Sequence, residues 1–95
     1  MSFKVISVTD GDTFQVSPNW EWKGQTGNIV RPLGYDTPEI GQPGYQAAKD
    51  KLTKLIDGKE VELRNAVKIT YGRLLCDVYL NNVNIATYFP EYINT

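Results

Sequence analysis

Residues 44–58 read GYQAAKDKLTKLIDG, and in this stretch the apolar side chains recur with the period of an α-helix. Charged side chains occupy the other positions, as expected for a helix with one face on a core. Gly58 follows as a typical C-terminal stop. We therefore predict a helix over about residues 44–57, whose apolar face consists of Tyr45, Ala48, Leu52, Leu55 and Ile56.

Short stretches rich in β-branched residues flank this helix and predict strands. Three precede it and two follow it, over residues 3–8, 13–17, 28–33, 59–67 and 73–80. A helix between the third and fourth of five strands is the plan of an OB-fold barrel. We therefore predict a mainly β, α+β protein with a five-stranded OB-fold barrel. A split ferredoxin-like sheet is the alternative, but it needs a helix after the first strand, where the sequence has only the turn 10–12.

The connections carry further local signals. Residues 18–27 are polar and contain Trp20 and Trp22, so we expect a loop. The two indole rings would either stack on nucleic-acid bases or, as we favour, cover the barrel or an oligomer contact. Pro32 cannot donate to a ladder and indicates an edge or a bulge. Asn81 and Asn82 predict a hairpin turn after the last strand.

After that turn, Asn84 is placed to cap a short helix over residues 85–89, which Pro90 would stop. The chain ends soon afterwards, and a shortened barrel end would expose apolar surface. We therefore hypothesise self-association into homo-oligomers through the C-terminal side.

Composition excludes several classes of function. The 95 residues predict a single domain, residues 1–95, and ten basic against eleven acidic side chains leave a net charge of -1. Because the chain has no histidine, catalytic triads and His-ligated zinc sites are excluded. The lone Cys76 is expected to be a buried small hydrophobe. We see neither a membrane-spanning run nor a secretory signal, so a cytoplasmic location is favoured and no membrane partner is expected.

Two acidic loops and two arginines are the candidate site. Asp10, Asp12, Asp36 and Glu39 follow strands, and their hard oxygens suit Ca²⁺ or Mg²⁺. Asp12 and Asp36 could bridge one cation if the barrel brings their loops together. Arg31 and Arg73 lie on strands and present paired donors that match phosphate oxygens. Taken one at a time, these motifs are more often turns and surface salt bridges.

The ordered set of motifs is more specific than any one of them. With x for any residue, it runs DGDTF (10–14), VRxLGxDTPE (30–39), GKxVxL (58–63), YGRxL (71–75) and VYL (78–80). This set strongly resembles the staphylococcal (thermonuclease-like) nuclease family from about residue 5 to residue 85. The resemblance implies an OB-fold barrel and a Ca²⁺-dependent phosphodiesterase that acts on DNA and RNA.

The resemblance also implies roles for individual residues. Asp12 and Asp36 look like the Ca²⁺ carboxylates, and Thr37 looks like the residue that adds a backbone-carbonyl ligand. Glu39 resembles the general base for the attacking water. Arg31 and Arg73 look like the arginines that hold the scissile phosphate. We therefore expect a Ca²⁺-dependent nuclease with single-stranded DNA or RNA as substrate.

The chain also departs from the family. Ile69 and Thr70 precede Tyr71 where a charged residue is common, and the C-terminal helix is short. The aromatic side chains of the family's base pocket have no match by motif, and Tyr88 and Tyr92 are the candidate substitutes. The alternative function is a non-catalytic OB-fold module that binds nucleic acid or protein.

Overall fold

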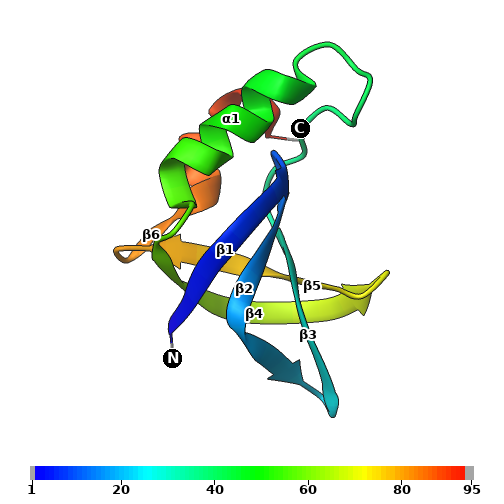
Figure 1. Ribbon diagram of the computed structural model, residues 1–95, viewed down its shortest axis with the longest axis vertical. Helices are drawn as coiled ribbons and strands as arrows, with labels where there is room; N and C mark the ends of the chain where they lie inside the picture. Colours follow the sequence, from blue (N-terminus) through cyan, green and yellow to red (C-terminus); the bar gives the residue numbers. More distant parts are fainter. Residues whose placement is uncertain (1, 94–95) are drawn as a thin grey trace.

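Five strands close into a barrel with one α-helix packed on it in the computed structural model, which describes residues 2–93 (Figure 1). The helix lies between the third and fourth strands of the barrel, so the predicted OB-fold architecture is confirmed. Residues 1, 94 and 95, at the ends of the predicted domain, lie outside the described part. The elements are β1 (Ser2–Asp10), β2 (Thr13–Trp22), β3 (Gln25–Pro32), α1 (Tyr45–Ile56), β4 (Glu60–Thr70), β5 (Arg73–Leu80) and the short β6 (Val83–Asn84).

Closure of the barrel depends on one parallel pairing. The antiparallel order β3-β2-β1-β4-β5-β6 forms an open sheet, and β3 then pairs with β5. Residues 29–32 of β3 lie opposite residues 73–76 of β5. Pro32 ends β3, opposite Cys76, and the amide of the next residue, Leu33, donates to the Cys76 carbonyl at 2.9 Å. Pro32 therefore lies where a missing N–H costs no interior ladder bond.

The prediction of a loop over residues 18–27 is wrong. β2 continues to Trp22, β3 begins at Gln25, and the turn between them has positive φ at Lys23 and Gly24. Trp20 provides the reason, because its ring is only 3% exposed and its Nε1 donates to the Ile29 carbonyl at 3.0 Å. Burial of one large aromatic side chain outweighs the polar character of its neighbours.

Trp20 therefore covers the barrel, as favoured over base stacking. Its partner across the hairpin is Gly27, where a Cβ atom would lie 2.8 Å from the Trp20 ring. Trp22 is partly buried against the same core. The hairpin is thus held by aromatic packing that a count of polar residues does not show.

The remaining strand predictions hold with small extensions. β5 has the predicted bounds, and β4 runs three residues further, to Thr70. Its register against β5 shifts between Arg64 and Lys68, where Asn65 has a φ of 55°. Asn81 and Asn82 both have positive φ in the hairpin turn, as predicted.

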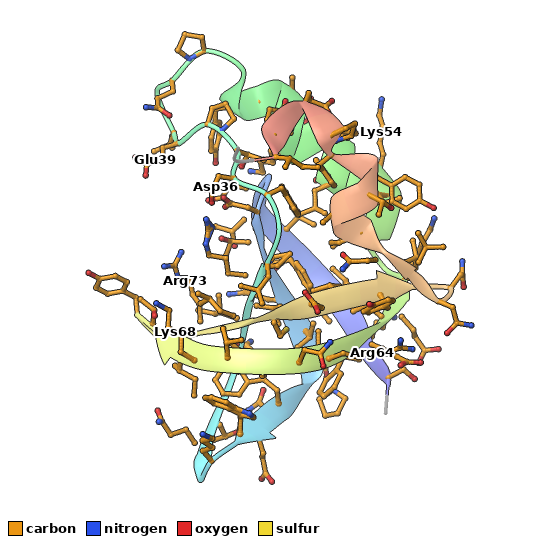
Figure 2. All side chains as sticks on the ribbon, turned by 180° about the vertical axis from the view of Figure 1, so that it is seen from behind. Asp36, Glu39, Lys54, Arg64, Lys68 and Arg73 are labelled. Carbon is orange, nitrogen blue, oxygen red and sulfur yellow. The ribbon has the colours of Figure 1, made fainter. Side chains whose placement is uncertain are left out.

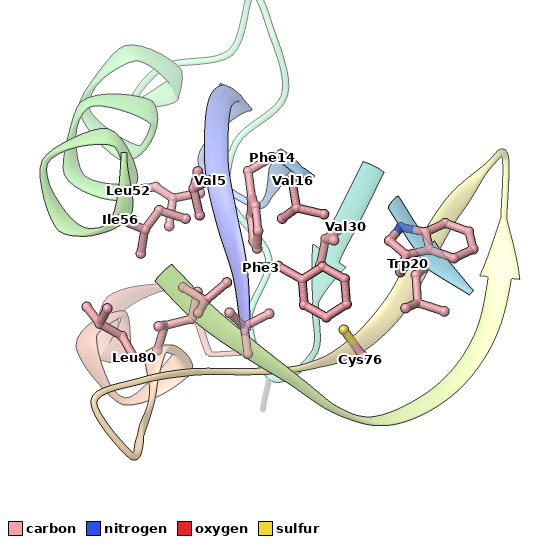
Figure 3. Packing of buried hydrophobic residues seen from close by; sticks show 14 of the residues in the cluster. Phe3, Val5, Phe14, Val16, Trp20, Val30, Leu52, Ile56, Cys76 and Leu80 are labelled. Carbon is pink, nitrogen blue, oxygen red and sulfur yellow. The ribbon is translucent and has the colours of Figure 1, made fainter. Parts of the chain in front are cut away.

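The core lies inside the barrel and under the helix (Figure 3). Ala48, Leu52 and Ile56 are the buried residues of α1, which confirms most of the predicted apolar face. The helix ends before Gly58, whose φ is 74°. Cys76 is fully buried, as predicted, and burial raises the pKa of its thiol to about 12. No helix within residues 2–93 has the length and apolar character needed to cross a bilayer.

The C-terminal segment packs over the same end of the barrel as α1 (Figure 1). Asn84 caps the short 3₁₀ helix Ile85–Tyr88 by accepting the Ala86 amide, as predicted. Pro90 does not only stop this helix; it opens a second one, Pro90–Tyr92. Phe89 is 0% exposed, and its ring stacks on Tyr35 with centroids 4.4 Å apart. The self-association expected through this side stays a prediction.

Phe89 tests whether the C-terminal segment is part of the cooperative fold. We expect Phe89→Ala to lower the free energy of unfolding by about 3–5 kcal/mol, because a fully buried ring leaves a cavity. The matched control is Tyr88→Ala, which removes a neighbouring ring that is 42% exposed and should cost within about 0.5 kcal/mol. Urea denaturation followed by tryptophan fluorescence measures both. Equal costs for the two variants would mean that the segment is not part of the folded core.

Candidate active site

One cleft of about 870 Å³ opens beside the barrel between the β1–β2 turn and the segment that joins β3 to α1. Strand β5 contributes a side chain from the opposite wall. The cleft is lined by the six residues that the sequence analysis gave a catalytic or metal-binding role, namely Asp12, Arg31, Asp36, Thr37, Glu39 and Arg73. The fold therefore brings together the two acidic loops and both arginines, and the roles of these residues stay predictions.

Asp12 is held where the two loops touch. Its own amide donates to Asp10 Oδ1 at 3.2 Å, and its Oδ2 accepts the Thr37 amide at 3.3 Å. Its side chain is only 13% exposed. Burial is the main cause that raises the pKa of the Asp12 carboxyl to about 6, and the hydrogen bond with Asp10 adds to it; the positive charge of Arg31 opposes the shift.

Arg31 joins the two acidic loops electrostatically. Its Nη1 lies 2.9 Å from Asp12 Oδ2, and its Nη2 forms a second ion pair with Asp36 Oδ1. One guanidinium group therefore serves two carboxylates that are 24 positions apart in the chain. The two carboxylates lie close enough to share a single positive group, as the sequence analysis required of a cation site.

Gly11 lets the loops and the helix approach this closely. A Cβ atom at Gly11 would lie 2.7 Å from Thr37 Oγ1 and 2.7 Å from the Ala48 Cβ of α1. Both distances are far below van der Waals contact, so no larger residue fits without movement. Thr37 Oγ1 is buried here and has no hydrogen-bond partner within the described residues. The meeting point of the three segments is therefore tightly packed.

Two tyrosines that the sequence analysis did not assign to the site support the cleft. Tyr35 is buried, and its hydroxyl donates to the Gly11 carbonyl at 3.0 Å; burial and the nearby Asp12 carboxylate raise the pKa of this phenol. Tyr45, expected only on the apolar face of the helix, lines the cleft and donates to the Thr9 carbonyl at 3.2 Å. Only the position of Tyr35 inside the motif 30–39 could have suggested its importance.

The C-terminal segment supports the Asp36 loop from behind. The Asp36 amide donates to the Tyr92 carbonyl at 3.0 Å, next to the stacked rings of Tyr35 and Phe89. Neither Tyr88 nor Tyr92, the candidate base-pocket residues, is among the side chains that line the cleft. In this structure Tyr92 contacts the loop through its backbone, and its ring packs partly against the core.

Glu39 and Arg73 face the cleft from different elements. Figure 2 shows Asp36 and Glu39 on the loop and Arg73 below them on β5. Glu39 is exposed, and its amide donates to Gln42 Oε1 at 2.7 Å; the Gln42 amide in turn donates to the Glu39 carbonyl at 2.9 Å and closes a tight turn. Arg73 Nε donates to the Thr70 carbonyl at 3.2 Å, and this bond orients the guanidinium group.

The donor set suits a hard cation that has an open coordination shell. Within residues 2–93, no three side chains of His, Cys, Asp or Glu cluster in a way that could hold a metal. A cation in this cleft would therefore rely on two carboxylates, a backbone carbonyl and smaller ligands such as water or phosphate oxygens. Because Asp12 and Asp36 already share a positive partner in Arg31, the residues present fit such a cation.

Comparison with known proteins gives distant relatives. No family model matches the chain. It is 33% identical to an uncharacterized protein of Methanocaldococcus jannaschii, with 93% of this chain and 53% of the relative aligned. It is 34% identical to Endonuclease Htp3 of Saprolegnia parasitica, with 80% of this chain and 44% of the relative aligned. A probable staphylococcal-like nuclease of Oryza sativa, CAN3, is 36% identical over 59% of this chain and 15% of its own length.

These alignments relate the chain to proteins with nuclease names at low identity and over only part of the relatives' length. Two of the relatives are named as nucleases, and the resemblance seen in the motifs agrees with those names. The chain spans 53% of the first relative and less of the other two.

The packing at Gly11 makes a prediction about the site. We expect Gly11→Ala to destabilise the protein by about 1–3 kcal/mol, because the added methyl group overpacks the junction of the two loops and α1. It should also shift the backbone amide resonances of Asp12 and Thr37 in a ¹⁵N–¹H NMR spectrum. The control is Gly41→Ala, where nothing lies within 4 Å of the added Cβ and only the φ of 88° opposes it. If Gly11→Ala leaves stability and both resonances unchanged, the loops are not packed as described.

Proposed function

We propose that this protein is a Ca²⁺-dependent nuclease that hydrolyses phosphodiester bonds of single-stranded DNA or RNA. One observation carries the proposal: two carboxylate loops and two arginines face the same cleft. A barrel that only binds nucleic acid has no physical need for carboxylates there, since they repel phosphate unless a cation intervenes. The nuclease names of the distant relatives point in the same direction.

Asp12, Asp36 and the Thr37 carbonyl would hold the cation. Bound there, Ca²⁺ would bring phosphate and water together and offset negative charge. Arg31 now pairs with both carboxylates, so a bound cation would compete with it for them. The guanidinium group would then have donors available for a phosphate in the same cleft.

The remaining chemistry belongs to the side chains of the chain. Glu39 accepts a proton from the attacking water as its oxygen forms a bond to phosphorus. The bond from phosphorus to the leaving oxygen then breaks, and that oxygen takes a proton from solvent. Negative charge grows on the phosphoryl oxygens during this displacement. Arg31 and Arg73 donate to those oxygens and stabilise the transition state more than the ground state.

Cleavage of a labelled single-stranded DNA tests the proposal. We expect products with Ca²⁺ and none with EDTA, with a parallel reaction in Mg²⁺ to identify the metal. Arg73→Ala should lower kcat by about 10²–10³-fold, since it removes fixed donors from the transition state. Glu39→Gln should lower it by about 10²–10⁴-fold through loss of the base.

The matched control for the arginine is Arg64→Ala. Arg64 lies at the far end of the β4–β5 pair (Figure 2) and is paired with Glu62 at 2.7 Å, so cleavage should be unchanged. A folded wild-type protein that cleaves neither DNA nor RNA with any divalent metal would contradict the proposal. That result would favour the non-catalytic binding module.

Thermal denaturation tests the cation site without catalysis. Ca²⁺ together with a nucleoside bisphosphate should raise the Tm, because a ligand that binds only the native state stabilises it by about 2.7 kcal/mol at 100 times its Kd. Asp36→Asn should abolish the rise. Asp57→Asn, at an exposed carboxylate just after α1, should retain it. A Tm that rises equally in both variants would show that the ligands bind elsewhere.

A further inference from the structure

Lys68 lies on the outer surface of the barrel next to the candidate site. In the β4–β5 ladder Lys68 is opposite Leu75, and in the β3–β5 ladder Arg31 is opposite the same Leu75. Arg31 and Lys68 therefore flank one residue of β5 from its two sides. Side chains on one rung of a sheet point to the same face.

The burial pattern identifies that face as the outside. Leu74 and Cys76 are buried, so Leu75 between them points away from the core. Lys68 is exposed, whereas the next residue on β4, Ile69, packs against the core. Both residues that flank Leu75 therefore point outward with it.

Arg73 shares this face, because it is two residues before Leu75 on β5. Lys68 is diagonal to Arg73 across the antiparallel pair, and such neighbours have Cα atoms about 7–8 Å apart. Figure 2 shows Lys68 and Arg73 at the same end of these strands, with Asp36 and Glu39 above them. Three cationic side chains from three adjacent strands thus lie on one continuous surface.

The side chains that line the cleft carry more negative than positive charge, so the positive surface formed by Arg31, Arg73 and Lys68 matters for binding nucleic acid. Two arginines and four carboxylates line the cleft, from Asp10, Asp12, Asp36, Glu39, Arg31 and Arg73. A cation bound to the carboxylates offsets them at the scissile phosphate, but the adjoining phosphates of a nucleic acid still need positive charge. Lys68 places a positive charge just outside the residues that line the cleft.

Arg64 and Lys54, the other two basic residues labelled in Figure 2, do not lie on the surface formed by Arg31, Arg73 and Lys68. Arg64 pairs with Glu62, stacks on the Tyr79 ring at 4.1 Å, and lies beyond the register shift of β4. Lys54 is exposed on α1, away from Arg73 (Figure 2). Unlike these two residues, Lys68 lies on the same outward face as both arginines of the cleft, because the strand register places it across from Leu75.

We propose that Lys68 binds the phosphate adjacent to the one held by Arg31 and Arg73, so that the site takes an oligonucleotide rather than an isolated phosphodiester. The inference rests on the proposed function, since it requires nucleic acid in the cleft. The long flexible lysine stem suits a backbone contact that needs charge and no fixed geometry. This contact positions the strand and carries no base specificity.

Binding of a fluorescent ten-nucleotide phosphorothioate DNA tests the contact by anisotropy in Ca²⁺. This probe keeps the backbone charge and reports binding whether or not the protein cleaves. Lys68→Ala should raise Kd about 3–10-fold at low salt and reduce the slope of log Kd against log salt concentration by about 0.7, the value for one phosphate contact on a single strand. Lys68→Arg should restore most of the affinity and the slope.

Lys54→Ala is the matched control, since it removes another exposed lysine and the same net charge without altering the surface around Lys68. Its affinity and slope should equal those of the wild type. If Lys68→Ala behaves like Lys54→Ala while the wild type binds, the inference is overturned. A wild type that does not bind the probe also overturns it, whereas a wild type that binds DNA normally but never cleaves it overturns only the nuclease proposal.

Discussion

The parallel pairing of β3 with β5 is the constraint on which the rest of the structure depends. It converts an open antiparallel sheet into a closed barrel and places residues 29–32 beside residues 73–76. Because side chains alternate along each strand, the same register buries Val30 and Leu74 and turns Arg31 and Arg73 outward. A slip of one residue would exchange the core and the cationic face.

The second constraint is the contact between the two acidic loops. Gly11 lies so close to Thr37 and Ala48 that a methyl group added at Gly11 would not fit. The Tyr35 hydroxyl donates to the Gly11 carbonyl and so holds the Tyr35 ring against this contact. The C-terminal segment holds this arrangement from behind through Phe89 and the Tyr92 carbonyl. The C-terminal segment therefore helps to hold the Asp36 loop in place at the cleft.

Burial of Asp12 has an electrostatic cost that the site offsets with Arg31. Desolvation raises the pKa of this carboxyl, and the guanidinium group counteracts it while also pairing with Asp36. Two acids held close together with a single positive partner form a site that a divalent cation would stabilise further. In the proposed chemistry, a bound cation would take over the two carboxylates from Arg31. The guanidinium group of Arg31 would then be available to bind phosphate.

Local patterns in the sequence by themselves determined most of the strands, the helix and the fold class. The spacing of apolar residues, the turn residues and the helix caps each depend on only a few neighbouring residues. The helix over residues 44–57, the turn at Asn81 and Asn82, and the Asn84 cap could all be predicted. The extension of β2 through Trp20 could not, because it depends on burial of this ring in the core and on its hydrogen bond to the Ile29 carbonyl across the hairpin, which the polar neighbours of Trp20 do not indicate. The types of residue in the site came from the motifs, but only the tertiary structure decided that Arg31 spans Asp12 and Asp36 and that Lys68 shares a face with both arginines. These relations are set by barrel closure and strand register, which arise from contacts between segments that no local pattern specifies.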